Sequence, residues 1–148
     1  QAVLLDFCRR HGLWLLADEV YERIYFAGAV APSLLRLCSR DDAVIVVQSF
    51  SKSYCMTGWR LGWVVSRRDL VHKAAQLNEF IVSHAPSMVQ RAGETALRDG
   101  EEFVRTMAQD LKCRVWSCFE SLKGIRGVSV APPEGSFYLF PRIEAPAA

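Results

Sequence analysis

The sequence predicts an α/β fold in which a mostly parallel sheet is flanked by helices and is followed by the start of a smaller α+β unit. Wholly apolar runs at 13–17 and 43–47 are typical of strands that are buried on both faces of a parallel sheet. Helical patterns lie between and after these runs, and alternating strands and helices indicate an α/β layer fold. After about residue 100 the pattern changes to a long helix and two short strands.

The length and composition indicate a globular protein. The chain has 148 residues, about one domain's worth, and its 51% hydrophobic residues can form a core, which excludes a disordered tail. No apolar run approaches the ~20 residues that span a bilayer. Gln1–Val3 does not begin a signal peptide, so we expect a cytoplasmic location and no membrane partner. The absence of an initiator Met indicates a fragment or a processed product.

Charge and cysteine usage exclude several other classes. The 18 Lys and Arg and 16 Asp and Glu give a net charge of +2, and the basic residues are scattered. A nucleic-acid partner requires a clustered basic face, so none is expected. The five cysteines lack CxxC spacing and the three histidines lack HExxH spacing, so we expect no disulfide framework and no metal site. We interpret the cysteines as reduced thiols of an intracellular protein.

The elements of the first half follow from apolar spacing and chain breakers. A helical stripe over 3–10 ends at Gly12, which suits a helix C-cap. The strand at 13–17 comes next, followed by a short helix over 32–39.

A second strand and a third one enclose a polar stretch. The strand at 43–47 is mostly β-branched, residues 49–60 are predicted to form a polar loop, and 61–65 is the third strand.

The second half is dominated by helical patterns. Ser66 is the expected N-cap of the first of them. Three helices and then two strands are expected over residues 67–83, 86–98, 101–123, 128–130 and 137–140.

Reactive side chains follow two of the predicted strands. The first strand ends in Asp18-Glu19-Val20-Tyr21 and the second in Ser49-Phe50-Ser51-Lys52, with Arg60 beyond it. Ligands of open α/β sheets bind outside the carboxyl ends of the strands. We therefore expect a carboxylate, a phenol, hydroxyls, an amine and a guanidinium around one pocket.

The segments Leu16–Tyr21 and Ser49–Gly62 resemble the pyridoxal-phosphate enzymes of the class I/II aminotransferase family, and most closely its aspartate/aromatic branch. The pattern is D-x-x-Y after one strand, S-x-S-K after the next, and T-G-W-R-x-G with its arginine eight positions past the lysine. The tail Pro133–Tyr138 is similar to the start of the small domain's sheet in this family. Each residue alone would be an ordinary surface or packing residue, so the prediction rests on the joint pattern.

The resemblance implies a role for each matching residue. Lys52 is the catalytic residue and holds the cofactor, pyridoxal 5′-phosphate, as a Schiff base. Asp18 pairs with the pyridine nitrogen, and Tyr21 hydrogen-bonds the cofactor's 3-oxygen. The remaining cofactor-binding residues contact the phosphate and are Ser49, Ser51 and Arg60. These residue types suit the chemistry, because a carboxylate keeps a pyridinium protonated, an amine acts as nucleophile and base, and a guanidinium offers a fork to phosphate.

The resemblance also implies a domain division and a function. Residues 1–99 are expected to be the C-terminal part of the cofactor-binding large domain, and 100–148 the interdomain helix and the start of the small domain. The expected reaction is transamination between an amino acid and a 2-oxo acid by a homodimer. The family's upstream phosphate loop and downstream substrate-carboxylate arginine are not in this sequence, so we expect the isolated chain to be inactive.

Three alternatives to a transaminase remain open at this point. One is a lyase or synthase of the same fold that uses the same lysine. Another is the aminotransferase-like effector domain of a transcription regulator, and the third is a non-catalytic, truncated paralogue.

Overall fold

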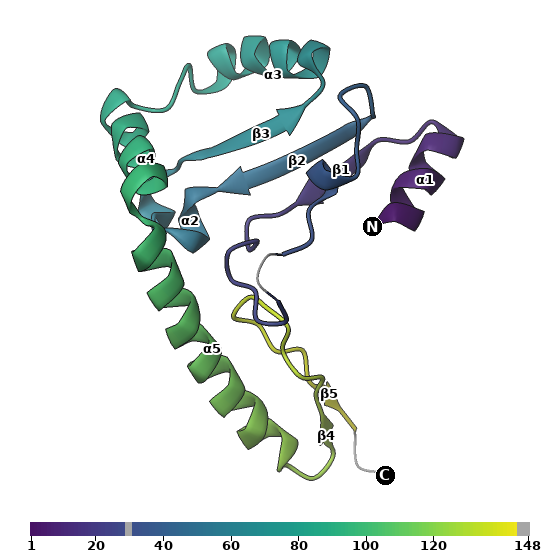
Figure 1. The fold of residues 1–148 in the computed structure, drawn as a ribbon, viewed down its shortest axis with the longest axis vertical. Helices are drawn as coiled ribbons and strands as arrows, with labels where there is room; N and C mark the ends of the chain where they lie inside the picture. The colour runs from purple at the N-terminus through teal and green to yellow at the C-terminus, as the bar shows by residue number, and fades with distance from the viewer. Residues whose placement is uncertain (29–30, 145–148) are drawn as a thin grey trace.

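The structure, a computed structural model, describes residues 1–28 and 31–144. Figure 1 shows one sheet with helices around it and a long helix, α5, that leads from this sheet to a small strand pair. In chain order the elements are α1 (Ala2–His11), β1 (Leu15–Asp18), the 3-10 turn η1 (Leu34–Arg36), β2 (Val44–Ser49), α2 (Phe50–Ser53), the 3-10 turn η2 (Thr57–Trp59), β3 (Gly62–Ser66), α3 (Arg68–Ile81), α4 (Ser87–Asp99), α5 (Glu101–Lys123), β4 (Val128–Ser129) and β5 (Arg142–Ile143).

The larger sheet has the strand order β1-β2-β3. Strand β1 is parallel to β2, with Asp18 opposite Val47. Strand β3 is antiparallel to β2, with Gly62 opposite Ser49. The ends of β1 and β2 and the start of β3 therefore share one edge of the sheet. Within the described residues only β2 has a strand on both sides, so the predicted interior position is confirmed for β2.

The core of the described chain lies against β1 and β2. Buried and half-buried residues alternate along β2, as expected of a strand whose two faces differ in environment. The fully buried members of the cluster come from α1, η1 and β2, and they are Leu5, Leu34, Val44 and Val46. This cluster fixes the strands whose ends carry the predicted site.

Several predicted elements are confirmed. Helix α1 ends at Gly12, whose φ of 62° is in the left-handed region that favours glycine. Helices α4 and α5 have nearly the predicted bounds, and Gly100 separates them.

Three local predictions are wrong. Residues 49–60 contain α2 and η2 rather than only a loop, because the Ser49 hydroxyl accepts a hydrogen bond from the Ser51 N–H and starts a helical turn. Ser66 does not cap α3, since its hydroxyl donates to the Val44 carbonyl oxygen at 2.6 Å. The last strand is β5, at Arg142–Ile143, rather than 137–140.

The C-terminal segment returns to the larger sheet's loops. Strands β4 and β5 pair antiparallel, and the chain between them lies beside 24–26 through hydrogen bonds from the Phe26 N–H to the Glu134 carbonyl and from the Ser136 N–H to the Ile24 carbonyl, both 2.7 Å. A Cβ at Gly135 would lie 2.8 Å from the Ile24 carbonyl oxygen, so this approach requires glycine.

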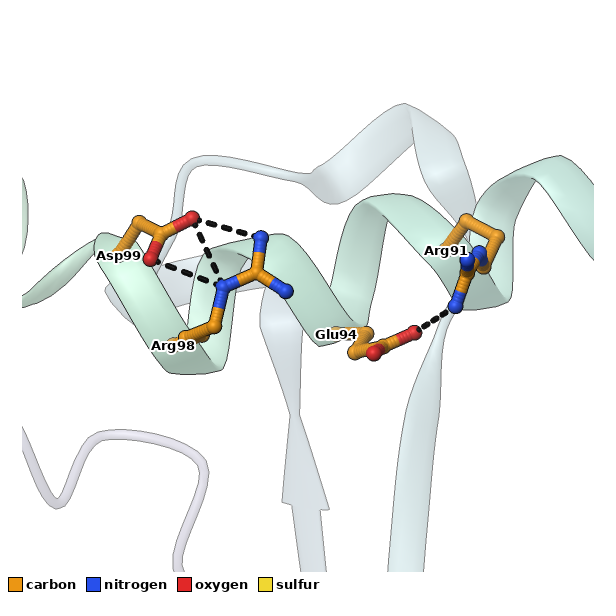
Figure 2. A network of polar contacts seen from close by, with 4 residues as sticks. All are labelled: Arg91, Glu94, Arg98 and Asp99. Carbon is orange, nitrogen blue, oxygen red and sulfur yellow. Dashed lines mark hydrogen bonds and ion pairs between the residues drawn. The ribbon is translucent and has the colours of Figure 1, made fainter.

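Helix α4 carries charged side chains on an exposed surface (Figure 2). Arg91 pairs with Glu94 at 2.6 Å and Arg98 with Asp99 at 2.9 Å. Exposed ion pairs of this kind contribute little to stability. Among residues 1–28 and 31–144, no helix is long and apolar enough to cross a membrane. Residues 145–148, at the end of the predicted second unit, lie outside the described residues.

Candidate functional site

The end of β1 presents the first part of the site. Asp18 is the last residue of the strand, and its carboxylate accepts a hydrogen bond from the Val20 N–H at 3.2 Å. Backbone hydrogen bonds from Glu22 to Glu19 and from Ile24 to Tyr21 then form tight turns. These turns place the Tyr21 side chain directly after the strand, as the D-x-x-Y spacing predicts.

The end of β2 presents the second part. Ser49 caps α2, and its hydroxyl also donates to the Leu61 carbonyl at 3.4 Å. Ser51 and Lys52 lie in the single turn of α2 that this cap begins. The amine is therefore held on a short ordered helix rather than on a free loop.

The Lys52 side chain is oriented by aromatic rings. Its Nζ atom lies 5.9 Å from the centroid of the Tyr21 ring and 5.7 Å from that of Phe137. An ammonium within about 6 Å of a ring centroid is attracted by the ring's quadrupole. These contacts bring Lys52 and Tyr21 together from the ends of two different strands.

Tyr21 has a second aromatic partner in the C-terminal segment. Its hydroxyl is 3.1 Å from the hydroxyl of Tyr138, and its ring lies edge-on to the rings of Phe137 and Tyr138. The hydrogen bond with Tyr138, together with desolvation and the nearby Asp18 carboxylate, raises the pKa of Tyr21 to about 12. Tyr21 therefore keeps its proton as a hydrogen-bond donor throughout the neutral pH range.

Arg60 lies in the connection from α2 to β3. It has a left-handed φ of 53°, and its guanidinium donates to the Thr57 carbonyl at 3.0 Å. The Thr57 hydroxyl donates in turn to the Ser51 carbonyl at 2.9 Å, which ties this connection to α2. Because Gly62 pairs with Ser49, Arg60 lies at the same edge of the sheet as Ser51 and Lys52 of α2.

The structure thus gathers the six predicted residues at one edge but joins only some of them. Lys52 contacts Tyr21, and Ser49 and Ser51 are hydrogen-bonded to each other. Asp18 and Arg60 are exposed side chains that touch neither Lys52 nor each other through any interaction found in residues 1–28 and 31–144.

Sequence reasoning missed three residues that shape this site. Phe137 and Tyr138 contact Lys52 and Tyr21, and the only signal for them was the tail's resemblance to a family segment. Glu19 accepts hydrogen bonds from the Ser33 hydroxyl at 2.7 Å and from the Leu34 N–H at 2.8 Å. It anchors the chain after β1, and no sequence pattern indicated this role.

Known proteins that are similar to this chain are aminotransferases. A family model for aminotransferase class I and II matches residues 2–148. The aspartate aminotransferase of Pyrococcus horikoshii is 32% identical over 142 residues, which are 95% of this chain and 36% of that protein. The aspartate aminotransferase of Geobacillus stearothermophilus is 31% identical over 144 residues, 97% of this chain and 37% of that protein.

Solved structures give a matching fold. A probable N-succinyldiaminopimelate aminotransferase from Thermus thermophilus superposes with a TM-score of 0.87 at 32% identity, covering 95% of this chain and 38% of that one. The aspartate aminotransferase from Rhizobium meliloti gives 0.87 at 30% identity, with 95% and 37% covered. The chain therefore spans a little over a third of the length of the relatives it matches.

Proposed function

The chain belongs to the class I and II aminotransferase family, and from this premise we propose that the full-length protein is a pyridoxal-phosphate-dependent transaminase. It would move an amino group between an amino acid and a 2-oxo acid, with the cofactor held covalently as a Schiff base on Lys52. The observation that carries this proposal is the position of the Lys52 amine, held against the Tyr21 ring between the ends of β1 and β2.

The donor set at this edge fits pyridoxal phosphate. The site offers a carboxylate for the pyridine nitrogen, a protonated phenol for the 3-oxygen, an amine for the aldehyde, and hydroxyls and a guanidinium for the phosphate. When bound, pyridoxal phosphate supplies an aldehyde that condenses with amines and a ring that accepts the electron pair released at a substrate α-carbon.

Lys52 would have two tasks. Its Nζ atom would hold the cofactor in the resting enzyme, and the amine, once free, would act as the base that takes the proton from the substrate α-carbon and delivers it to the cofactor carbon that takes up the amino group. The Tyr21 and Phe137 rings limit the positions that this flexible side chain can take. Such restriction keeps the base within reach of the reacting atoms.

Asp18 and Tyr21 would set the protonation state of the ring. The Asp18 carboxylate at the end of β1 would hold a proton on the pyridine nitrogen, which an ion pair of this kind favours. Tyr21 would donate a hydrogen bond to the 3-oxygen, because its phenol keeps its proton at neutral pH.

Ser49, Ser51 and Arg60 would bind the phosphate. The Arg60 guanidinium donates one N–H to the Thr57 carbonyl. An arginine has five such donors in a fork that matches phosphate oxygens, so the others can bind phosphate. The Ser51 hydroxyl lies on the same turn as Lys52.

Domain organisation, assembly and location are also proposed. Residues 1–99 would complete the large domain, 100–148 would form the interdomain helix and the start of the small domain, and the full-length protein would be a homodimer. The five cysteines are free, which supports a reducing compartment such as the cytoplasm.

Product analysis of the full-length protein tests the reaction. Cofactor-loaded protein mixed with an amino acid alone should release the matching 2-oxo acid once per site. Addition of a second 2-oxo acid should then restore the initial absorption spectrum of the bound cofactor. Continuous release of ammonia without a second oxo acid would instead identify a lyase.

A further inference from the structure

The C-terminal segment brings a second phenol to the site that no role above uses. Tyr138 lies far from Tyr21 in the sequence, yet their hydroxyl oxygens are 3.1 Å apart and their ring centroids 5.8 Å apart. Three groups with titratable or charged side chains therefore face Tyr21: Tyr138 from this segment, Asp18 from β1 and Lys52 from α2.

The approach of Tyr138 is built into the backbone. Gly135 allows the segment to lie against Ile24, where a larger residue would meet the carbonyl oxygen at 2.8 Å. Ser136 has a left-handed φ of 59°, which is uncommon for a residue other than glycine, and its hydroxyl accepts the Tyr138 N–H at 3.2 Å. A close approach and a constrained turn thus aim Tyr138 at Tyr21.

We propose that Tyr138 is a positioning residue. Its hydroxyl donates a hydrogen bond to the Tyr21 hydroxyl, and this bond orients and strengthens the hydrogen bond from Tyr21 to the cofactor's 3-oxygen. The inference rests on the proposed function, which gives Tyr21 that task. A phenol has one proton to donate and two lone pairs that accept. In the structure either phenol can be the donor of the bond between them. If Tyr21 donates its hydrogen to the cofactor's 3-oxygen, the bond between the two phenols has to run from Tyr138 to Tyr21. Each bond in such a chain polarises the next.

The arrangement has a spectroscopic consequence. A hydrogen bond donated to the 3-oxygen withdraws charge from it and weakens its hold on the proton that it shares with the Lys52 nitrogen. Removing this donor raises the pH at which the visible absorption band of the bound cofactor titrates. Loss of the Tyr138 hydroxyl should also raise this pH, but by less, because Tyr138 acts only through Tyr21.

The test is a pH titration of that band in full-length, cofactor-loaded protein. Tyr21→Phe should raise the midpoint by about 1–2 pH units, since hydrogen bonds to charged groups have that strength. Tyr138→Phe should raise it by about 0.2–0.5 units, the share expected for a polarising neighbour. The double variant should match Tyr21→Phe alone. Tyr138 is 60% exposed, so loss of its hydroxyl should leave the fold intact.

Tyr25→Phe is the matched control. Tyr25 pairs with Gly135 through its backbone, and its hydroxyl forms no hydrogen bond within residues 1–28 and 31–144. This variant should titrate like the wild type. An unshifted midpoint in Tyr138→Phe, or an added shift in the double variant, would overturn the role of Tyr138 and leave the proposed function standing. A wild-type protein that forms no cofactor band on Lys52 would overturn both.

Discussion

The strand-end site and helix α3 differ in how many of their contacts this chain provides. At the site, side chains and backbone from β1, β2, the connection to β3 and the C-terminal segment meet through hydrogen bonds and aromatic contacts. Helix α3 has no buried residue over its 14 positions. Near its end Phe80 is 89% exposed, and Met88, the second residue of the following α4, is 76% exposed.

This difference separates the geometry of the site from the stability of the fold. The chain spans a little over a third of its relatives' length, so the apolar side chains of α3 are expected to be covered in the full-length protein. The site needs no such cover to form its turns, because its hydrogen bonds are local or run to the returning segment. Substitutions at the site should therefore change turnover or cofactor affinity, and substitutions on α3 should change the aggregation of the isolated chain.

The largest effect on turnover among the binding residues is expected from Asp18→Asn. An amide cannot hold the pyridine nitrogen protonated, so kcat of the full-length enzyme should fall roughly 10²–10³-fold, the range found for lost electrostatic stabilisation. Cofactor affinity should change much less, because the phosphate contacts remain. Steady-state kinetics and cofactor titration measure the two quantities. Asp110→Asn, at an exposed side chain on α5, is the control, and equal turnover in the two variants would refute the role of Asp18.

Arg60→Ala should act on affinity instead. The loss of a charge-assisted bond worth about 1.5–3 kcal/mol should raise the cofactor Kd by about 10–100-fold. Equilibrium dialysis of the apoenzyme with pyridoxal phosphate measures this change. Arg126→Ala, at another exposed arginine, should leave the Kd unchanged. If both variants bind equally well, Arg60 lies outside the phosphate site.

Two glycines near the site provide a sharper structural contrast. A Cβ at Gly62 would lie 2.5 Å from the Gln48 carbonyl oxygen, whereas one at Gly58 would meet nothing within 4 Å. Gly62→Ala should therefore lower the free energy of unfolding by about 1–3 kcal/mol, as forced repacking does, and Gly58→Ala should change it little. Denaturant unfolding of the full-length variants measures both. Similar values would mean that the β2–β3 pairing beside Ser49 adapts freely.

The smallest effect on folding is expected on α3. Residues 1–148 alone should be inactive and should aggregate. In this isolated chain, Phe80→Ser should reduce light scattering, because it removes an exposed apolar side chain. The same substitution should change the free energy of unfolding by no more than about 0.5 kcal/mol. Gln76→Ser, an exposed polar position on the same helix, should leave scattering unchanged. A sharply melting monomer of residues 1–148 that performs the half-reaction would contradict the contrast between the two regions.

The sequence predicted the strands that carry the site but not the contacts within it. The apolar runs identified β1 and β2, and the polar residues after them identified the edge at which the site lies. The sequence did not reveal α2, because its start depends on one hydrogen bond to the Ser49 hydroxyl. Nor did it indicate the contacts of Tyr138, which depend on a backbone pairing between segments about 110 residues apart. Local patterns predict elements, whereas long-range pairing decides which side chains meet.

The most direct test of the account is the location of the cofactor. Full-length protein incubated with pyridoxal phosphate is reduced with borohydride, digested, and mapped by mass spectrometry. The account predicts one pyridoxyl group, on Lys52, whose amine lies against the Tyr21 ring. An adduct on Lys73 or Lys112, on helices α3 and α5, or no adduct at all, would contradict it.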